Sequence, residues 1–307
     1  SAGDRPFLEK KLPFYPLERG LESTVAERIS LGFRWLKDVL GTGPHGLLRV
    51  GSGDWADPIS LMVDDGRAFH TAGESGLNTA FAVHVFPRAA ALLEPFDPES
   101  ASEMRSFSNQ LRAAMEEAWA GRWYLRGWDG RGNPLGDTHL FADVQAFCAI
   151  AGIGDRDRRE AYIGELIRRN IDPSPIGPLI VDRPHPVRLN LIPPGWDCNG
   201  GVWAAIGAFL VWGLALIDPP AAAKCLLGQT LAAHARAYPH IWYGIWSGPD
   251  CYNAHYAEKP GETFCLPPTP MCEFPVMNSN AHAGPLLAAL KLSQALGVGA
   301  GSADPSP

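Results

Sequence analysis

The pattern of apolar and polar positions predicts a chain built mainly from helices. In four stretches the apolar side chains recur at helical spacing on one face, with charged side chains opposite: 21–40, 99–119, 156–170 and 219–236. In four others the predicted helix is apolar nearly all round: 74–94, 138–152, 200–217 and 281–297. The sequence therefore predicts an all-α fold in which the two kinds of helix alternate.

This alternation predicts two layers, with the apolar helices inside. Connections that leave an apolar helix are short, whereas those that lead into one are long: 41–72, 120–137, 171–199 and 237–280. In an up-and-down arrangement all four long connections lie at one end, around the N-termini of the inner helices. Helix dipoles favour anions and polar ligands there, so we expect binding and catalysis at this end.

Three smaller segments depart from the helical pattern. Residues 1–19 are expected to form an extended lead-in, and 122–136 a small β-hairpin that turns on Asp129 and Gly130. Residues 200–217 carry no charge over about the length of a membrane span. Because the segment is rich in Gly and Ala and has no basic flank, it is predicted to be a buried helix.

Composition and charge narrow the class of protein. The 307 residues are 46% hydrophobic and carry a formal net charge of −7 without any basic run. We therefore expect one soluble domain over 1–307, with neither nucleic acid nor membrane as a partner. The cysteine pattern favours a reduced, cytoplasmic protein. The six cysteines and the histidines show no metal-ligand spacing, so no metal site is predicted. A disulfide among Cys251, Cys265 and Cys272 is left open.

The most informative stretch for chemistry is 51–58, GSGDWADP, in which Asp54 and Asp57 flank Trp55. Glycine and proline break regular structure on both sides, so these side chains are free to face a cleft. A carboxylic acid beside an indole suits sugar chemistry, because the ring packs on a pyranose and partial desolvation favours a protonated carboxyl. The alternative is an Asx-turn capped by Asp54, with Trp55 on the surface.

The last long connection combines aromatic rings with polar side chains. Its members are Trp242, Tyr243, Trp246, Asp250, Tyr252, Asn253, His255, Tyr256, Glu262, Phe264 and Glu273. Stacking surfaces and hydrogen-bonding groups together suit a polyhydroxylated ligand. The alternative is a loop that packs on itself through its own aromatic rings.

Seven short motifs occur in order along the chain. They are His45-Gly46-Leu47, Gly53-Asp54-Trp55-Ala56-Asp57, Gly73-Glu74-Ser75, Arg122-Trp123-Tyr124-Leu125-Arg126 with Asn133-Pro134-Leu135-Gly136, Val144-Gln145-Ala146-Phe147, Asn199-Gly200-Gly201 and Gly248-Pro249-Asp250. In this order they resemble the motifs HGL, GDWND, GESVW, WYLR with TPLG, PQSW, ENGG and GPD or GPE of glycoside hydrolase family 94, the cellobiose and chitobiose phosphorylases with the cyclic β-1,2-glucan synthases.

The resemblance implies an (α/α)6 barrel, of which this chain contains about eight of twelve helices, the C-terminal two-thirds of the catalytic barrel. The first four helices and the family's β-sandwich have no counterpart in the sequence. The resemblance therefore implies either a fragment or a partner chain that completes the barrel, and a homodimer is left open.

The resemblance also implies that Asp57 is the general acid. Where relatives hold phosphate with a histidine after ENGG, this chain has Val202-Trp203-Ala204-Ala205, and no threonine aligns later. We therefore expect a glycosidase that inverts a β-glucosidic bond. Inversion needs two carboxyl groups about 6.5–9.5 Å apart, with one of them activating water. Glu273 is the preferred base, and Asp250 and Glu262 are alternatives.

Other side chains are expected to bind an oligosaccharide or glucan: Asp54, Trp55, Glu74, Arg126, Gln145, Trp246 and Tyr252. Two further functions are left open. One is a phosphorylase with inorganic phosphate as co-substrate, held by His282 or Arg188, or a glucan synthase module. The other is a carbohydrate-binding remnant without turnover. No cofactor is expected in any of the three.

Overall fold

The computed structural model describes residues 5–187, 191–241, 251–262 and 279–298. Each predicted helix is present, and the fold is all-α with small antiparallel sheets. The eight long helices are α2 (Val25–Arg34), α4 (Gly76–Leu93), α5 (Pro98–Glu117), α6 (Ala142–Ala151), α7 (Arg156–Leu166), α8 (Ala204–Ala215), α9 (Pro219–Gly228) and α12 (Ser279–Ala295).

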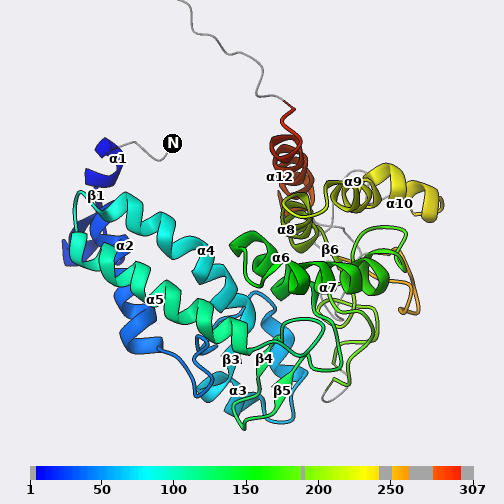
Figure 1. Ribbon diagram of the computed structural model, residues 1–307, viewed down its shortest axis with the longest axis horizontal. Coiled ribbons are helices and arrows are strands. Elements are labelled where there is room, and N and C mark those ends of the chain that lie inside the picture. Colours follow the sequence, from blue (N-terminus) through cyan, green and yellow to red (C-terminus); the bar gives the residue numbers. More distant parts are fainter. Residues whose placement is uncertain (1–4, 188–190, 242–250, 263–278, 299–307) are drawn as a thin grey trace, which may run out of the picture.

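These helices form the two layers that the sequence predicts. In the inner layer α4 packs on α6, α6 on α8, and α8 on α12. In the outer layer α5 covers α4, α7 contacts α6, and α9 covers α8 (Figure 1). This is the arrangement of an (α/α)6 barrel, of which the described residues form an open arc.

Burial follows the apolar pattern of each helix. The residues of α6 are buried all round, whereas α5 buries the stripe Met104, Phe107, Leu111 and Met115 and exposes its charged face. Burying a large apolar side chain contributes roughly 1.5–3 kcal/mol. The alternation of one-sided and all-round apolar helices therefore determines which layer each helix enters.

The N-terminal segment differs from the predicted extended lead-in. It contains α1 (Arg5–Glu9) and a strand pair, β1 (Lys11–Pro13) with β2 (Glu22–Thr24). The first long helix consequently begins at Val25 rather than at residue 21. A capping box fixes this start: the Thr24 hydroxyl accepts from the backbone N–H of Glu27 (3.1 Å), and the Glu27 carboxylate accepts from the backbone N–H of Thr24 (2.7 Å).

Three other predicted elements differ from the structure in detail. The predicted helix 219–236 is divided, because Thr230 caps a separate helix, α10 (Leu231–Ala237). The predicted loop 41–72 contains α3 (Gly66–Ala72), which Asp65 caps. The predicted hairpin is present as β4 (Gly127–Trp128) with β5 (Pro134–Leu135), but its turn spans 129–133 and is held by the Asp129 carboxylate.

Short strands precede the inner helices. β3 (Glu74–Ser75) leads into α4 and pairs with β4, and β6 (Val202–Trp203) leads into α8 and pairs with β7 (Cys251–Tyr252). Phe141, which leads into α6, pairs with Val181. Through these pairs, the described parts of the four long connections meet at the N-terminal end of the inner helices. Figure 1 shows β3, β4 and β5 gathered there beside α3.

The two ends of the inner row expose apolar side chains. On one side, Trp35 and Phe81 are about half exposed, and Phe81 lines an apolar pocket of about 290 Å³ between residues 36–40 and α4. On the other side, Leu286 and Leu290 of α12 are more than half exposed. Among the described residues, none of the helices is both long and apolar enough to cross a membrane.

Candidate functional site

The loop that carries Asp54, Trp55 and Asp57 is attached to the N-terminus of α4. The Asn78 amide donates to the carbonyl oxygen of Gly53 (3.1 Å), and the backbone N–H of Val50 donates to the carbonyl oxygen of Gly73 (2.9 Å). Ser75, the N-cap of α4, accepts from the backbone N–H of Asn78 (3.1 Å) and donates its hydroxyl to Oδ2 of Asp54 (2.7 Å). The loop therefore lies at the end of the barrel where the long connections meet.

Beneath this loop, Arg126 joins two aspartates in a fully buried ion cluster. Its Nη1 donates to Oδ2 of Asp54 (3.1 Å), its Nη2 donates to Oδ1 of Asp54, and its Nε donates to Oδ2 of Asp143 (2.9 Å). The side chains of Arg126, Asp54 and Asp143 are 0%, 2% and 1% exposed. A buried charge is tolerated only when it is paired and hydrogen-bonded, as each of these is.

Burial and the shared guanidinium act differently on the two carboxyl groups. For Asp54, burial alone would raise the pKa, but the Arg126 charge together with the bonds from Arg126, Ser75 and Ala56 holds it below its usual range. For Asp143, burial raises the pKa, and the nearby Asp54 charge adds to it against the attraction of Arg126. Asp54 is therefore the ionised partner of Arg126, and Asp143 is the member that takes up a proton first.

Asp57 begins a short 3₁₀ helix, Asp57–Leu61, directly after this anchored loop. The structure describes its backbone, and its side chain lies outside the described part. The Asx-turn that the sequence left as an alternative is present, because the backbone N–H of Ala56 donates to Oδ1 of Asp54 (3.0 Å). The role of Asp57 as general acid remains a prediction.

Trp55 meets an aromatic ring from a distant part of the chain. Its indole is 36% exposed and packs edge-on against Trp203, with ring centroids 4.9 Å apart. Trp203 lies in β6, next to the strand β7 that carries Tyr252, and the Tyr252 ring stacks on His234 (4.4 Å). The arrangement brings the loop of Asp57 next to the strand pair of β6 and β7, and Trp55 stays partly exposed to solvent.

Glu74 is buried and holds the loop around His45. Its carboxylate accepts from the backbone N–H groups of His45 (3.1 Å) and Leu47 (3.2 Å) and contacts Nδ1 of His45 (2.5 Å). The imidazole in turn stacks flat on Trp128, 3.9 Å between ring centroids. Gly43 passes so close that a Cβ there would lie 2.4 Å from the Glu74 side chain.

Gln145 is also buried, at 0% exposure, and both ends of its amide bond the backbone of Tyr124. The oxygen accepts from the Tyr124 N–H (3.1 Å), and the nitrogen donates to the Tyr124 carbonyl (2.8 Å). These bonds link α6 to the segment that leads into β4. The structure thus shows Gln145 and Glu74 bonded to the protein backbone. Their predicted contacts with a sugar remain predictions.

The remaining predicted residues belong mainly to the last long connection. Glu273, Asp250, Trp246 and Arg188 lie outside the described residues, and so does the side chain of His282. Glu262 is described and half-buried, and its carbonyl oxygen accepts from the backbone N–H of Asn253 (2.7 Å). The identity of the catalytic base therefore remains a prediction.

The described residues include some of the side chains that were considered as metal ligands or disulfide partners. Within the described ranges no three His, Cys, Asp or Glu side chains come together as metal ligands. Cys148, Cys198 and Cys225 are buried thiols, and burial raises the pKa of Cys225 to about 12. Cys265 and Cys272 lie outside the described residues, so the disulfide question stays open.

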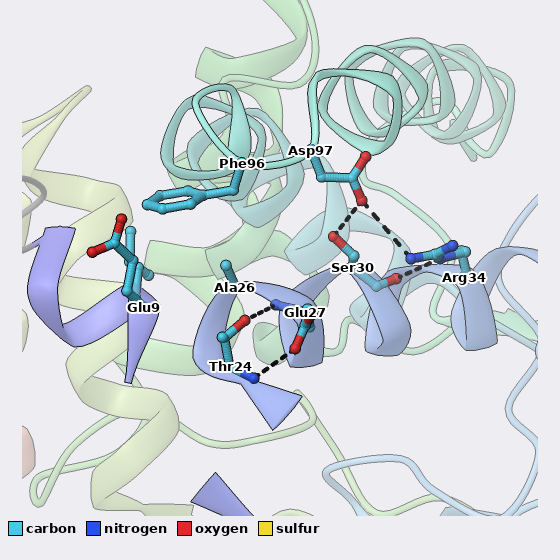
Figure 2. Close-up of a pocket in the computed structure, with 9 residues that line it drawn as sticks. Glu9, Thr24, Ala26, Glu27, Ser30, Arg34, Phe96 and Asp97 are labelled. Carbon is cyan, nitrogen blue, oxygen red and sulfur yellow. Dashed lines mark hydrogen bonds and ion pairs between the residues drawn. The ribbon is translucent and has the colours of Figure 1, made fainter. Parts of the chain in front are cut away.

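A pocket of about 320 Å³ lies at the other end of the barrel, between α1, α2 and the turn after α4 (Figure 2). Its polar groups mostly bond one another: the Ser30 hydroxyl donates to Asp97 (2.8 Å), and Thr24 and Glu27 form the capping box. At 1.5 Å per residue, α4 separates this pocket from Ser75 by roughly 27 Å. The pocket is thus distinct from the loop of Asp57.

Sequence reasoning missed several members of the site. Ser75 lies in the motif Gly73-Glu74-Ser75 and Trp203 two residues after Asn199-Gly200-Gly201, but neither was predicted to belong to the site, and Asp143 was not singled out. The one available signal for Asp143 was an acidic residue in an otherwise apolar helix. Such a residue needs a buried partner, but the sequence does not say which one.

The two helical layers, with carboxylates and indoles at the N-terminal end of the inner helices, define the class of α/α-barrel catalytic domains. Comparison with known proteins identifies the family. Residues 1–205 match the model described as "Glycosyl hydrolase 94 superfamily, catalytic domain". The chain belongs to this family.

Two curated relatives have phosphorylase names. One is the 3-O-beta-D-glucopyranosyl-beta-D-glucuronide phosphorylase of Paenibacillus borealis, 30% identical over 181 residues, 55% of this chain and 22% of the relative. The other is the cellobionic acid phosphorylase of Neurospora crassa, 29% identical over 127 residues, 41% of this chain and 15% of the relative. The chain thus spans less than a quarter of either relative.

Solved structures agree on the fold. The GH63 mannosylglycerate hydrolase of Thermus thermophilus matches with a TM-score of 0.59 at 16% identity, over 90% of this chain and 71% of that one. The GH78 rhamnosidase of Bacillus sp. GL1 matches with a TM-score of 0.53 at 14% identity, over 86% and 23%. At these identities the likeness concerns the fold alone.

Proposed function

We propose that this chain is part of a glycoside phosphorylase that cleaves a β-glucoside with inversion. Asp57 protonates the glycosidic oxygen, and inorganic phosphate attacks the anomeric carbon from the opposite face. Family membership and the phosphorylase names of both curated relatives support this function. The observation that carries it is the anchored loop: Asp57 lies three residues after Asp54, which the buried guanidinium of Arg126 fixes beside Ser75, the N-cap of α4.

The substrate class follows from the names of the relatives. Both act, by name, on sugar acids, a glucosyl-glucuronide and cellobionic acid. We therefore propose a β-glucoside of an acidic sugar as the first substrate to test. The exposed indole of Trp55, backed by Trp203, provides a stacking surface for a pyranose ring.

Hydrolysis is the second candidate, and one observation favours it. After Asn199-Gly200-Gly201 the chain continues with Val202-Trp203-Ala204-Ala205, without the phosphate-binding histidine that the family resemblance implies at this point. An anion site that lacks a donor binds phosphate less well. In this version a carboxylate of the last connection, with Glu273 preferred, activates water.

We also propose that the catalytic unit is larger than this chain. The exposed apolar faces at Trp35 and Phe81, and at Leu286 and Leu290, support further helices packed there, from the same polypeptide or a partner. The part of this chain that matches the two curated relatives covers only 22% and 15% of their lengths, which supports the same proposal. Activity is therefore to be measured in the longest natural form.

The test is Asp57→Asn in that form, with glucosyl-glucuronide and cellobionic acid as substrates, with and without inorganic phosphate. Loss of the general acid is expected to lower kcat about 10²–10⁴-fold. Asp64→Asn, the same charge change at an exposed position on the same connection, is the matched control and should leave kcat unchanged.

The product distinguishes the candidates. Phosphate-dependent release of glucose 1-phosphate supports the phosphorylase, and phosphate-independent release of glucose supports the hydrolase. Wild-type turnover that Asp57→Asn leaves intact would remove Asp57 as the acid. Sugar binding without any turnover by the wild type would instead select the carbohydrate-binding remnant.

A further inference from the structure

We infer that Arg126 is a positioning residue: through Asp54 it fixes the loop that carries Trp55 and Asp57, in place of the direct sugar contact expected from the sequence. This inference rests on the proposed function, because it concerns how the acid and the stacking ring of that site are held. Four features of the buried cluster support it.

The first is that Asp54 has no acceptor left for a sugar. A carboxylate offers about four lone-pair sites. On Oδ1 they are taken by Nη2 of Arg126 and the backbone N–H of Ala56 (3.0 Å), and on Oδ2 by Nη1 of Arg126 (3.1 Å) and the Ser75 hydroxyl (2.7 Å). With a side chain only 2% exposed, Asp54 is a structural acceptor that acts on its own loop.

The second is the short path from the guanidinium to Asp57. Asp54 holds the backbone N–H of Ala56, and the carbonyl oxygen of Ala56 accepts from the backbone N–H of Ile59 (2.9 Å), which closes the first turn of the 3₁₀ helix Asp57–Leu61. Trp55 lies between the two anchored residues. Any shift of Asp54 therefore displaces both the stacking indole and the start of the helix that carries the acid.

The third is that Arg126 connects the loop to the N-terminal ends of two inner helices. Its Nε donates to Asp143 (2.9 Å) in the first turn of α6, and its Nη1 lies 3.4 Å from the hydroxyl of Ser75, the N-cap of α4. Helix ends in the core are more rigid than a loop. Since a displacement of about 1 Å can reduce a rate about 100-fold, this anchoring bears directly on catalysis.

The fourth is that the geometry requires a guanidinium. Arg126 bonds Asp54 through two nitrogens and Asp143 through a third, a planar fork that the single ammonium of lysine does not reproduce. Arg126→Lys therefore keeps the charge and removes the fork. It tests orientation rather than electrostatic attraction.

The experiment compares Arg126→Lys with Arg169→Lys in the longest natural form. Arg169 also joins two carboxylates, Glu165 through Nε (2.6 Å) and Asp182 through Nη1 (2.9 Å), but it lies in the outer layer after α7. For each variant kcat and KM are determined per folded molecule, with the folded fraction measured by circular dichroism at the assay temperature. We expect Arg126→Lys to lower kcat about 100-fold with KM within about threefold, and Arg169→Lys to leave both unchanged.

Asp143→Asn is the second variant, because Arg126→Lys can fail to fold. It keeps the pair of Arg126 with Asp54 and weakens only the bond that orients Nε, so a smaller fall in kcat at unchanged KM is expected. If Arg126→Lys does not fold, a wild-type kcat in Asp143→Asn overturns the inference.

Three results overturn the inference. They are a wild-type kcat per folded molecule in Arg126→Lys, a raised KM at unchanged kcat, and an equal loss of kcat in Arg169→Lys. A raised KM would instead indicate direct contact with substrate. Absence of turnover in the wild type refutes the proposed function, and with it the inference. Wild-type turnover that the variants do not change removes the inference alone.

Discussion

Gly43 and Glu74 offer a quantitative test of the packing at this end of the barrel. A Cβ at position 43 would lie 2.4 Å from Cγ and Cδ of Glu74 and 2.7 Å from its Oε1. Glu74 is not free to move away, because its carboxylate accepts from the backbone N–H groups of His45 and Leu47 and contacts the His45 ring. We therefore expect Gly43→Ala to force the two side chains apart or break these bonds.

The expected magnitudes follow from known effects of similar changes. Overpacking of this kind costs about 1–3 kcal/mol of unfolding free energy. Glu74→Ala leaves buried backbone donors without an acceptor and should cost about 3 kcal/mol. In the Glu74→Ala background the three nearest atoms that the new Cβ would meet, Cγ, Cδ and Oε1 of Glu74, are gone. In that background the alanine at position 43 acts only by reducing the conformational entropy of the unfolded chain. This reduction stabilises the folded protein by about 0.4–1 kcal/mol.

The assay is a double-mutant cycle by urea denaturation. Gly43→Ala is expected to destabilise the wild type by about 2 kcal/mol and to stabilise Glu74→Ala slightly, a coupling of about 2–3 kcal/mol. Gly53→Ala is the control, since nothing lies within 4 Å of a Cβ built there. Additivity of the two substitutions within about 0.5 kcal/mol would refute the close approach described above.

Two further predictions concern other parts of the fold. Because the pKa of Asp143 is raised in the folded protein, the folded state binds more protons than the unfolded one at pH values above about 4, the ordinary range of an aspartate. The stability of the wild type relative to Asp143→Asn should therefore decrease from pH 4 to pH 7 in urea titrations, and a constant or growing difference would contradict the raised pKa. Thr24→Ala removes one bond of the capping box of α2 and should lower the unfolding free energy by about 1 kcal/mol, as thermal or urea unfolding will show; no change would mean that the cap does not limit stability.

Much of the architecture could be predicted from local pattern. Apolar periodicity is set within a few turns of helix, so the sequence identifies the helices and, from the all-round apolar set, the inner layer. Connection lengths place the long loops at one end. Boundaries were less certain: the start at Val25 depends on the capping box of Thr24, and the break at Thr230 depends on a second cap within one apolar pattern.

The site could be predicted only in part. The order of motifs indicates the family and the loop of Asp57, but periodicity does not say which charged side chains are buried together. From the sequence, Arg126 and Asp54 were candidate sugar ligands, and the structure buries both with Asp143. The Asx-turn at Asp54 was foreseen as an alternative to the site, whereas the structure shows that it forms part of the anchored loop.

By itself, then, the sequence determines the helices, their two layers and the end at which the long connections meet, because each depends on the spacing of apolar residues along a short stretch. Only the tertiary structure decides that Arg126 joins Asp54 to Asp143, that Glu74 holds His45, and that Trp55 meets Trp203. These partners are far apart in sequence. Each pairing is favourable only once the helices exclude water, because a buried charge needs its partner where an exposed one does not.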